Sequence, residues 1–108
     1  ARLDSALKDV PAKSFRILMT HDPAHWSDQI RGKTDIPFTL SGHTHGGQTG
    51  LKIAGMEFSP IWLTGKRWGG LYKENDQFLY VNRGIGCVGL PARIDMPPEI
   101  TVFTLSQK

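Results

Sequence analysis

The stretch IPFTLSGHTHGGQTG, residues 36–50, joins an apolar run to two histidines set among glycines. Residues 36–42 are mostly apolar and end at a glycine, which predicts a short buried strand. His43 and His45 follow it, and in an extended backbone alternate side chains point the same way, about 7 Å apart along the strand. Two imidazoles in that arrangement can bind one metal ion or serve one each of two adjacent metal ions.

Another histidine follows a second apolar run. FRILMT, residues 15–20, predicts a strand buried on both faces, and His21 comes directly after it. If the two strands are parallel neighbours, His21 and His43 emerge at the same carboxyl edge of the sheet, where open α/β sheets place their sites. The glycines within residues 42–47 let the backbone turn and let a metal ion and its substrate approach closely.

Spacing alone leaves other interpretations of the histidines open. H-x-H pairs also occur by chance, and a histidine after a strand is more often a surface or hydrogen-bonded residue than a metal ligand. His25 lies one helical turn after His21, and a solvent-facing position is the simpler interpretation for it.

Two glycine motifs do not carry the function that their patterns usually indicate. GIGCVG, residues 84–89, matches a dinucleotide-binding pattern, but Pro91 and two later prolines follow where that motif requires a helix. GKT, residues 32–34, resembles the end of a phosphate loop, but Ser27 stands where that motif requires glycine. We expect both to be turns or loops.

Composition bounds the class of protein. The 108 residues suffice for one small domain, residues 1–108, and not for two. The net charge of +3 comes from scattered basic residues, so no nucleic-acid partner is expected. The single Cys87 excludes an intrachain disulfide, and no apolar run reaches the roughly 20 residues that span a bilayer, so we expect a soluble chain of unassigned compartment. Its start, without Met and inside a helical pattern, suggests a segment of a longer protein or a trimmed N-terminus.

The remaining pattern predicts short helices and strands in mixed order. Asp22 before Pro23 is an N-cap signature. The expected elements are a helix over residues 3–10, strands over 15–20 and 36–42, a helix over 22–30, short β pieces such as 56–60, a hairpin over 70–84 that turns at Asn75 and Asp76, and a strand over 99–106. This order predicts an α/β (α+β) fold with sheet layers and helices on an outer face.

Two blocks carry a resemblance to a known family. ILMTHDP, residues 17–23, followed by LSGHTHGGQ, residues 40–48, resembles the last two signature blocks of the calcineurin-like metallophosphoesterases. Residues 69–105 resemble, more narrowly, the C-terminal part of the branch that includes bacterial YkuE-like and YaeI-like phosphodiesterases. The resemblance covers nearly the whole chain.

The resemblance implies an αββα double β-sandwich, of which this chain is the C-terminal half, with a mixed sheet and short flanking helices. It also implies two divalent metal ions, Mn, Fe or Zn, that hydrolyse a phosphodiester or pyrophosphate bond. His21 and His43 would be ligands of the second metal and His45 a ligand of the first. Asp22 would orient a ligand ring and Arg83 would contact the phosphate, although a helix cap and a hairpin charge are at least as good interpretations of these two residues.

The resemblance also bears on partners and completeness. It implies a phosphoester small molecule as substrate, with nucleotide-lipid molecules as a narrower class, and leaves membrane association of a longer bacterial protein open. The family's earlier blocks, which supply the bridging carboxylate, are not found in residues 1–108. We therefore expect the chain to be inactive or nearly inactive alone, and to form a homo-oligomer through the sheet face that the missing half would cover.

Two other function classes stay open. One is a non-catalytic domain whose histidines hold a single structural metal, which predicts one tightly bound zinc ion and unfolding on chelation. The other is a metal-free structural domain whose histidines are ordinary polar residues. In that case, replacing His43 would change little beyond local packing.

Overall fold

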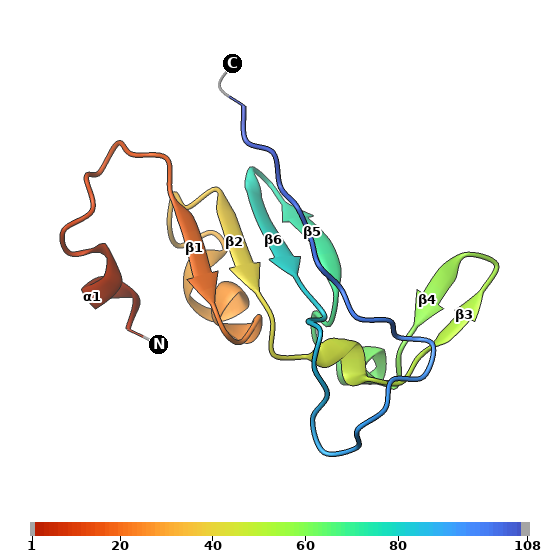
Figure 1. Ribbon diagram of the computed structural model, residues 1–108. Helices are drawn as coiled ribbons and strands as arrows, with labels where there is room; N and C mark the ends of the chain where they lie inside the picture. Colours follow the sequence, from red (N-terminus) through yellow and green to blue (C-terminus); the bar gives the residue numbers. More distant parts are fainter. Residues whose placement is uncertain (1, 107–108) are drawn as a thin grey trace.

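A four-stranded mixed sheet forms the centre of the computed structural model, which describes residues 2–106 (Figure 1). The elements in chain order are α1 (Leu3–Leu7), β1 (Ile17–Thr20), η1 (Trp26–Ile30), β2 (Phe38–Ser41), η2 (His45–Gly47), β3 (Leu51–Ile53), β4 (Met56–Phe58), η3 (Pro60–Thr64), β5 (Gly70–Glu74) and β6 (Gln77–Val81). The strand order is β1-β2-β6-β5, with β5 antiparallel to β6 and the other pairs parallel. β3 and β4 form a separate hairpin. The predicted α+β class, a mixed sheet with short helices, is confirmed.

The local sequence patterns locate most of these elements. The hairpin predicted over residues 70–84 is confirmed: β5 and β6 pair up to Glu74 opposite Gln77, so Asn75 and Asp76 form the two-residue turn. β2, α1 and β4 likewise lie inside the ranges predicted for a strand, a helix and a short β piece. These elements follow from short-range periodicity and turn residues, which act through neighbours in the chain.

The helix predicted over residues 22–30 forms, with an α-helical start and a π-helical end, η1. Asp22 caps its first turn, because its Oδ1 accepts a hydrogen bond from the backbone N–H of Ala24 at 2.8 Å. Within residues 2–106, no helix has the length and the hydropathy that a bilayer crossing requires.

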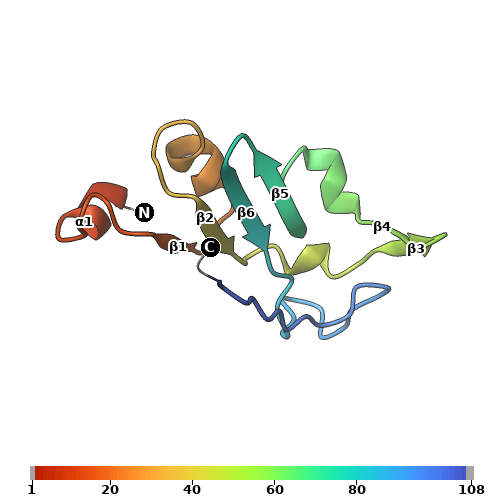
Figure 2. The same ribbon diagram turned by 90° about the horizontal axis from the view of Figure 1, so that it is seen from above.

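η1 covers one face of the sheet and supplies much of the hydrophobic core (Figure 2). Trp26 and Ile30 are fully buried and pack with Leu79 and Val81 of β6 and with Ile36. Burying side chains of this size stabilises a fold by roughly 1.5–3 kcal/mol each. The packing therefore fixes η1 on the sheet, and with it the loop that leads from β1 into η1.

The opposite face of the sheet is more open than the sequence predicts. The prediction that β1 is buried on both faces is wrong, since Ile17 is 39% exposed and Met19 is 80% exposed. The register pairs Ile17 with Phe38 and Met19 with Leu40, so these side chains share the face turned away from η1. β1 lies at the edge of the sheet, and no helix among the described residues covers this face there.

The prediction of a strand over residues 99–106 is also wrong. The segment is extended, but it crosses the face of the sheet opposite η1 instead of joining an edge (Figures 1 and 2). The ring of Phe103 meets the rings of Phe38 and Tyr80 edge-on, at centroid distances of 5.2 and 5.0 Å. Ile100, in the same segment, is 85% exposed. The alternating pattern therefore indicates an extended backbone, but it does not indicate that the segment is hydrogen-bonded to a neighbouring strand.

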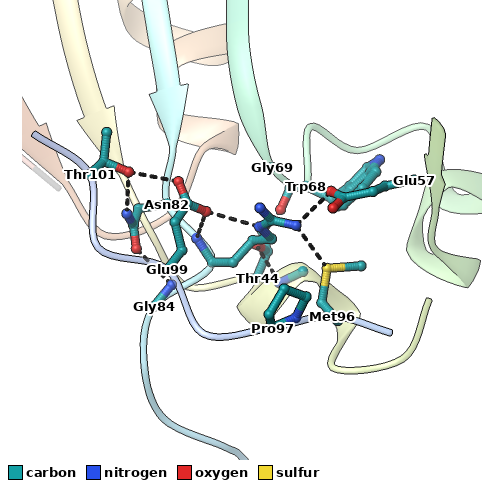
Figure 3. A network of polar contacts seen from close by, with 12 residues as sticks. Thr44, Glu57, Trp68, Gly69, Asn82, Gly84, Met96, Pro97, Glu99 and Thr101 are labelled. Atoms are coloured by element: carbon teal, nitrogen blue, oxygen red, sulfur yellow. Dashed lines mark hydrogen bonds and ion pairs between the residues drawn. The ribbon is translucent and has the colours of Figure 1, made fainter. Parts of the chain in front are cut away.

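Glu99 anchors this C-terminal segment to the end of β6 (Figure 3). Its carboxylate accepts hydrogen bonds from Arg83 Nε at 2.9 Å, from the Arg83 backbone N–H at 3.1 Å, from the Thr101 hydroxyl at 2.7 Å and from the Tyr80 hydroxyl. Burial raises the pKa of Glu99, but these hydrogen bonds outweigh burial and lower its pKa to about 2. Burial and the hydrogen bond to Glu99 raise the pKa of Tyr80.

Replacing this carboxylate tests the anchor. Glu99→Gln is expected to lower the free energy of unfolding at neutral pH, because the folded chain stabilises the charged form of Glu99. Because the pKa of Glu99 is lower in the folded chain than its ordinary value of 4.5, its charge stabilises the fold at any pH above 4.5. That stabilisation is lost as the pH falls toward about 2. Urea unfolding across this range should show the difference between variant and wild type shrinking at low pH. Asp9→Asn, which removes an exposed carboxylate, is the control, and an undiminished Glu99→Gln difference near pH 2 would contradict the assignment.

Candidate metal centre

His21 and His43 lie side by side at one edge of the sheet. β1 and β2 are parallel and in register, so the chain leaves both strands at the same carboxyl edge. The backbone N–H of Gly42 and the hydroxyl of Ser41 both donate to the carbonyl oxygen of His21, at 3.2 and 2.9 Å. The two imidazole rings are 4.6 Å apart between centroids, at an interplanar angle of 57°. The prediction that these histidines share a carboxyl edge is confirmed.

The loop that carries the histidine motif, residues 42–48, has an unusual backbone. We call it the glycine loop. Five of its residues have φ in the left-handed region: His43 (70°), His45 (50°), Gly46 (63°), Gly47 (73°) and Gln48 (57°). That conformation is costly for residues with a side chain, and such strain is concentrated at functional sites in proteins.

Packing beneath the glycine loop explains two of its glycines. A Cβ atom on Gly46 would lie 2.7 Å from Met96 Sδ and 3.0 Å from Arg83 Cδ. A Cβ atom on Gly47 would lie 2.6 Å from Ser59 Oγ. The sequence suggests that these glycines leave room for a metal ion and substrate, whereas the structure shows that they let the loop rest on side chains from other segments.

His45 turns toward the loop that follows β6. Its Nδ1 lies 3.3 Å from the carbonyl oxygen of Gly86. Because a carbonyl only accepts hydrogen bonds, this contact places the imidazole proton on Nδ1 and leaves the Nε2 lone pair for another partner. Within residues 2–106, no group of three or more His, Cys, Asp or Glu side chains is placed to bind one ion. The structure thus pairs His21 with His43 and sets His45 apart.

Arg83 connects the end of β6 to two other segments through its ion-pair partners Glu57 and Glu99, which Figure 3 labels. Its Nη1 lies 2.6 Å from Glu57 of β4, and its Nε lies 2.9 Å from Glu99. These ion pairs hold the guanidinium beneath Gly46. These contacts indicate that Arg83 positions the glycine loop. The phosphate contact suggested for Arg83 stays a prediction. So does the ring-orienting role suggested for Asp22, whose carboxylate caps the α-helical turn that precedes η1.

His25 is a hydrogen-bonded residue in this structure. Its Nδ1 lies 2.9 Å from the hydroxyl of Thr20, and its Nε2 lies 3.1 Å from Oε1 of Gln29. The ring is half-buried, so the solvent-facing position expected for it is wrong. Both ring nitrogens have partners, which makes His25 a suitable comparison for the histidines of the sheet edge.

A cleft of about 320 Å³ opens beside His43. Its lining includes the polar residues Asp22, Ser27, His43, Thr44, Lys66 and Arg67. Arg67 donates to the Ser27 hydroxyl at 2.8 Å and to Glu74 at 3.0 Å, whereas Lys66 is exposed. Sequence analysis missed both cations. The adjacent basic pair after Gly65, which ends η3, was the available signal, but only the fold brings it next to His43.

Alanine at Gly46 tests the packing of the glycine loop. Gly46→Ala is expected to lower the free energy of unfolding by about 2–4 kcal/mol, because it adds both a left-handed alanine and a clash with Met96. Gly55→Ala is the matched control: its φ is also positive, at 83°, but no heavy atom lies within 4 Å of the added Cβ, so about 1 kcal/mol is expected. Chemical denaturation measures both, and equal losses would mean that the packing beneath Gly46 contributes nothing.

Sequence comparison places these features in a family. The Bacillus subtilis protein named metallophosphoesterase YkuE is 41% identical over 105 residues, which cover 94% of this chain and 35% of that protein. The Escherichia coli phosphodiesterase YaeI is 33% identical, over 83% of this chain and 32% of its own length. A Danio rerio transmembrane protein with metallophosphoesterase domain is also 33% identical, over 97% of this chain and 23% of its own length.

The chain thus spans about a third or less of the length of these relatives. No family model and no solved structure matches it. The alignments with YkuE and with the Danio rerio protein nevertheless cover nearly all of its residues. The chain belongs to the metallophosphoesterase family and corresponds to its C-terminal part.

Proposed function

We propose that this chain is the C-terminal part of a phosphoesterase that hydrolyses phosphodiester or pyrophosphate bonds with two divalent metal ions. His21 and His43 would hold one ion, and His45 would hold the other. The observation that carries the proposal is the pair of imidazole rings, 4.6 Å apart, at the carboxyl ends of two parallel strands. Imidazole nitrogens are ligands that Mn, Fe and Zn accept. When bound, such a metal pair activates a water molecule and neutralises phosphoryl oxygens.

The chain's own residues have distinct parts in this proposal. The carbonyl oxygen of Gly86 would fix the His45 ring by accepting a hydrogen bond from its Nδ1–H, which would leave Nε2 to bind the metal. Lys66, exposed in the cleft beside His43, would attract the anionic substrate. Arg83 would hold the glycine loop through Glu57 and Glu99 and would contact the phosphate when substrate binds. Asp22, also in the cleft lining, would orient a ligand ring.

The substrate we propose is a small-molecule phosphoester, with nucleotide-lipid phosphodiesters or pyrophosphates as the narrower class. One relative is named a phosphodiesterase, which supports the broader class. Residues 1–108 hold two paired histidines and no counterpart of the family's earlier blocks with their bridging carboxylate. We therefore propose that the isolated chain has little or no turnover. Full phosphodiesterase turnover by residues 1–108 alone would refute this.

Removing one imidazole tests the metal centre. In the full-length protein, His43→Ala is expected to lower the bound transition metal and to reduce hydrolysis of bis(p-nitrophenyl) phosphate by at least about 100-fold. His25→Ala, the control, should keep the metal content. Metal analysis and Mn or Zn titration of both variants give the comparison. One tightly bound zinc ion whose chelation unfolds the protein would indicate a structural metal, and no bound metal in the wild type would indicate a metal-free domain.

The open face of the sheet predicts self-association of residues 1–108 taken alone. Met19 is 80% exposed in an apolar row with Leu40, and an apolar face of this kind is usually buried by a partner. Sedimentation at tens of micromolar should show an oligomer, and Met19→Glu should shift it to monomer. Ile85→Glu places the same charge at an exposed site outside the sheet and should leave the oligomer intact. A wild-type monomer would remove the support for this proposal.

A further inference from the structure

We propose that Arg93 is a positioning residue for His45, the histidine that lies apart from the other two. The planar guanidinium group of Arg93 holds the carbonyl oxygen of Gly86, and this oxygen holds the imidazole ring in the form that can bind a metal ion. The inference rests on the proposed function, because it concerns how one of the proposed metal ligands is oriented.

The loop that carries Gly86 and Arg93, residues 84–98, extends beyond the carboxyl edge of the parallel strands (Figure 1). We call it the long loop. Loops of this length that lack helices and strands of their own are uncommon in compact domains and are often functional. The shape of such a loop depends on the side chains that bind its backbone.

Arg93 joins the beginning of the long loop to its end. Its Nε and Nη2 atoms lie 2.9 and 2.7 Å from the carbonyl oxygen of Gly86. Nη2 also lies 2.7 Å from the carbonyl oxygen of Arg83. Nη1 lies 3.2 and 3.4 Å from the carbonyl oxygens of Met96 and Pro97. A guanidinium group has five N–H donors, and these five hydrogen bonds occupy all of them.

This set of partners favours a positioning role over a substrate contact for Arg93. All five hydrogen bonds end on backbone carbonyl oxygens, so no donor is left for a phosphoryl oxygen. Hydrogen bonds from a charged donor are roughly twice as strong as neutral ones. Arg93 therefore fixes the direction in which these carbonyl groups point.

The Gly86 carbonyl depends on this support. The φ angle of Gly86 lies outside the left-handed region, and no heavy atom beyond its chain neighbours lies within 4 Å of a Cβ atom built on it. Neither a special backbone conformation nor close packing thus holds the residue, and glycine has the greatest backbone freedom of any residue. The hydrogen bonds that its carbonyl oxygen accepts set the direction of that oxygen.

The same oxygen accepts the hydrogen bond from His45 Nδ1, at 3.3 Å, which is the longest of its three contacts. If the carbonyl turned away, the His45 ring would lose the partner that keeps its proton on Nδ1. The proton would then be free to move to Nε2, the nitrogen that the proposed function assigns to the metal ion. Loss of such a support for a ligand imidazole typically weakens metal binding by about 10- to 100-fold.

Gln48 holds the middle of the long loop independently of Arg93. Its buried side chain donates from Nε2 to the carbonyl oxygens of Leu90 and Ala92, at 3.0 and 3.3 Å. Its Oε1 accepts a hydrogen bond from the backbone N–H of Val88. We therefore expect the long loop to stay docked on the glycine loop when Arg93 is replaced, with the change confined to the region of Gly86.

Nitrogen NMR of the histidine rings in the metal-free, full-length protein tests the proposal. The His45 ring of the wild type should carry its proton on Nδ1. Arg93→Met, which removes all five donors and keeps an unbranched side chain, is expected to shift the ring to the Nε2–H form. A wild-type ring that already has the Nε2–H form, or a ring that Arg93→Met leaves unchanged, would overturn the proposal.

Two further variants separate positioning from a general loss of stability. Arg16→Met removes another arginine that donates to a backbone carbonyl oxygen, that of Ala12, and it lies at the opposite end of β1 from the carboxyl edge. It should leave the His45 ring unchanged, and an equal shift in this control would refute the role of Arg93. Arg93→Lys keeps the charge but lacks the planar fork, so it should shift the ring in the same direction as Arg93→Met. A wild-type ring in Arg93→Lys would contradict the proposal.

Titration of the full-length protein with Mn²⁺ alone distinguishes this inference from the proposed function. Arg93→Met is expected to weaken one of two Mn²⁺ sites by about tenfold, and Arg16→Met should weaken neither. A wild type that binds no Mn²⁺ would refute the proposed function, and with it the purpose assigned to Arg93. A wild type that binds two ions, with both affinities unchanged in Arg93→Met, would refute the role of Arg93 alone.

Discussion

The parallel pairing of β1 with β2 is the constraint on which the candidate site depends. Four residues of each strand lie in register, and both strands then end at the same edge of the sheet. His21 and His43 are more than 20 positions apart in the sequence, and only this pairing places their rings side by side. η1 connects the two strands as a crossover and packs on the sheet through Trp26, so the same core that stabilises the fold sets the spacing of the two imidazoles.

A second constraint acts around Arg83. Its two ion pairs draw a strand end, a hairpin and the C-terminal segment toward one guanidinium group. Glu99 keeps its charge in this setting because donors surround it, which lowers its pKa to about 2 in spite of burial. The positive charge of Arg83 is thus shared between the carboxylates of Glu57 and Glu99. Arg83 therefore has a structural role in this chain, apart from any contact with a ligand.

Local sequence predicted the parts of the structure that depend on neighbours in the chain. The two-residue turn at Asn75, the cap at Asp22 and the placement of His21 after a strand all follow from short-range chemistry. The failures share another origin. The alternation of apolar and polar residues over 99–106 predicted a strand because such alternation indicates an extended backbone. Pairing with a neighbouring strand depends instead on whether an edge of the sheet is accessible to the segment. The apolar character of β1 predicted burial because apolar side chains are unfavourable in water. It does not indicate which segment would pack over them.

The site shows the same division. The histidine motif was visible in the sequence, and so was the family resemblance that assigns it to phosphoester chemistry. The cleft beside His43 was not visible, because Lys66 and Arg67 reach it only through the position of η3. Likewise, no spacing rule connects Glu57 with Arg83. Side chains that meet through tertiary packing have no periodic signal, so sequence analysis finds the motif and misses its supports.

The left-handed backbone of the glycine loop has a consequence for folding order. Thr44 donates to the carbonyl oxygen of Trp68, Ser59 reaches the carbonyl oxygen of Gly46, and Met96 packs beneath that glycine. The loop thus reaches its shape only after three later segments of the chain have docked. A nascent chain that has emerged only as far as the histidine motif lacks these contacts, so the proposed metal binding would be coupled to completion of the fold instead of preceding it.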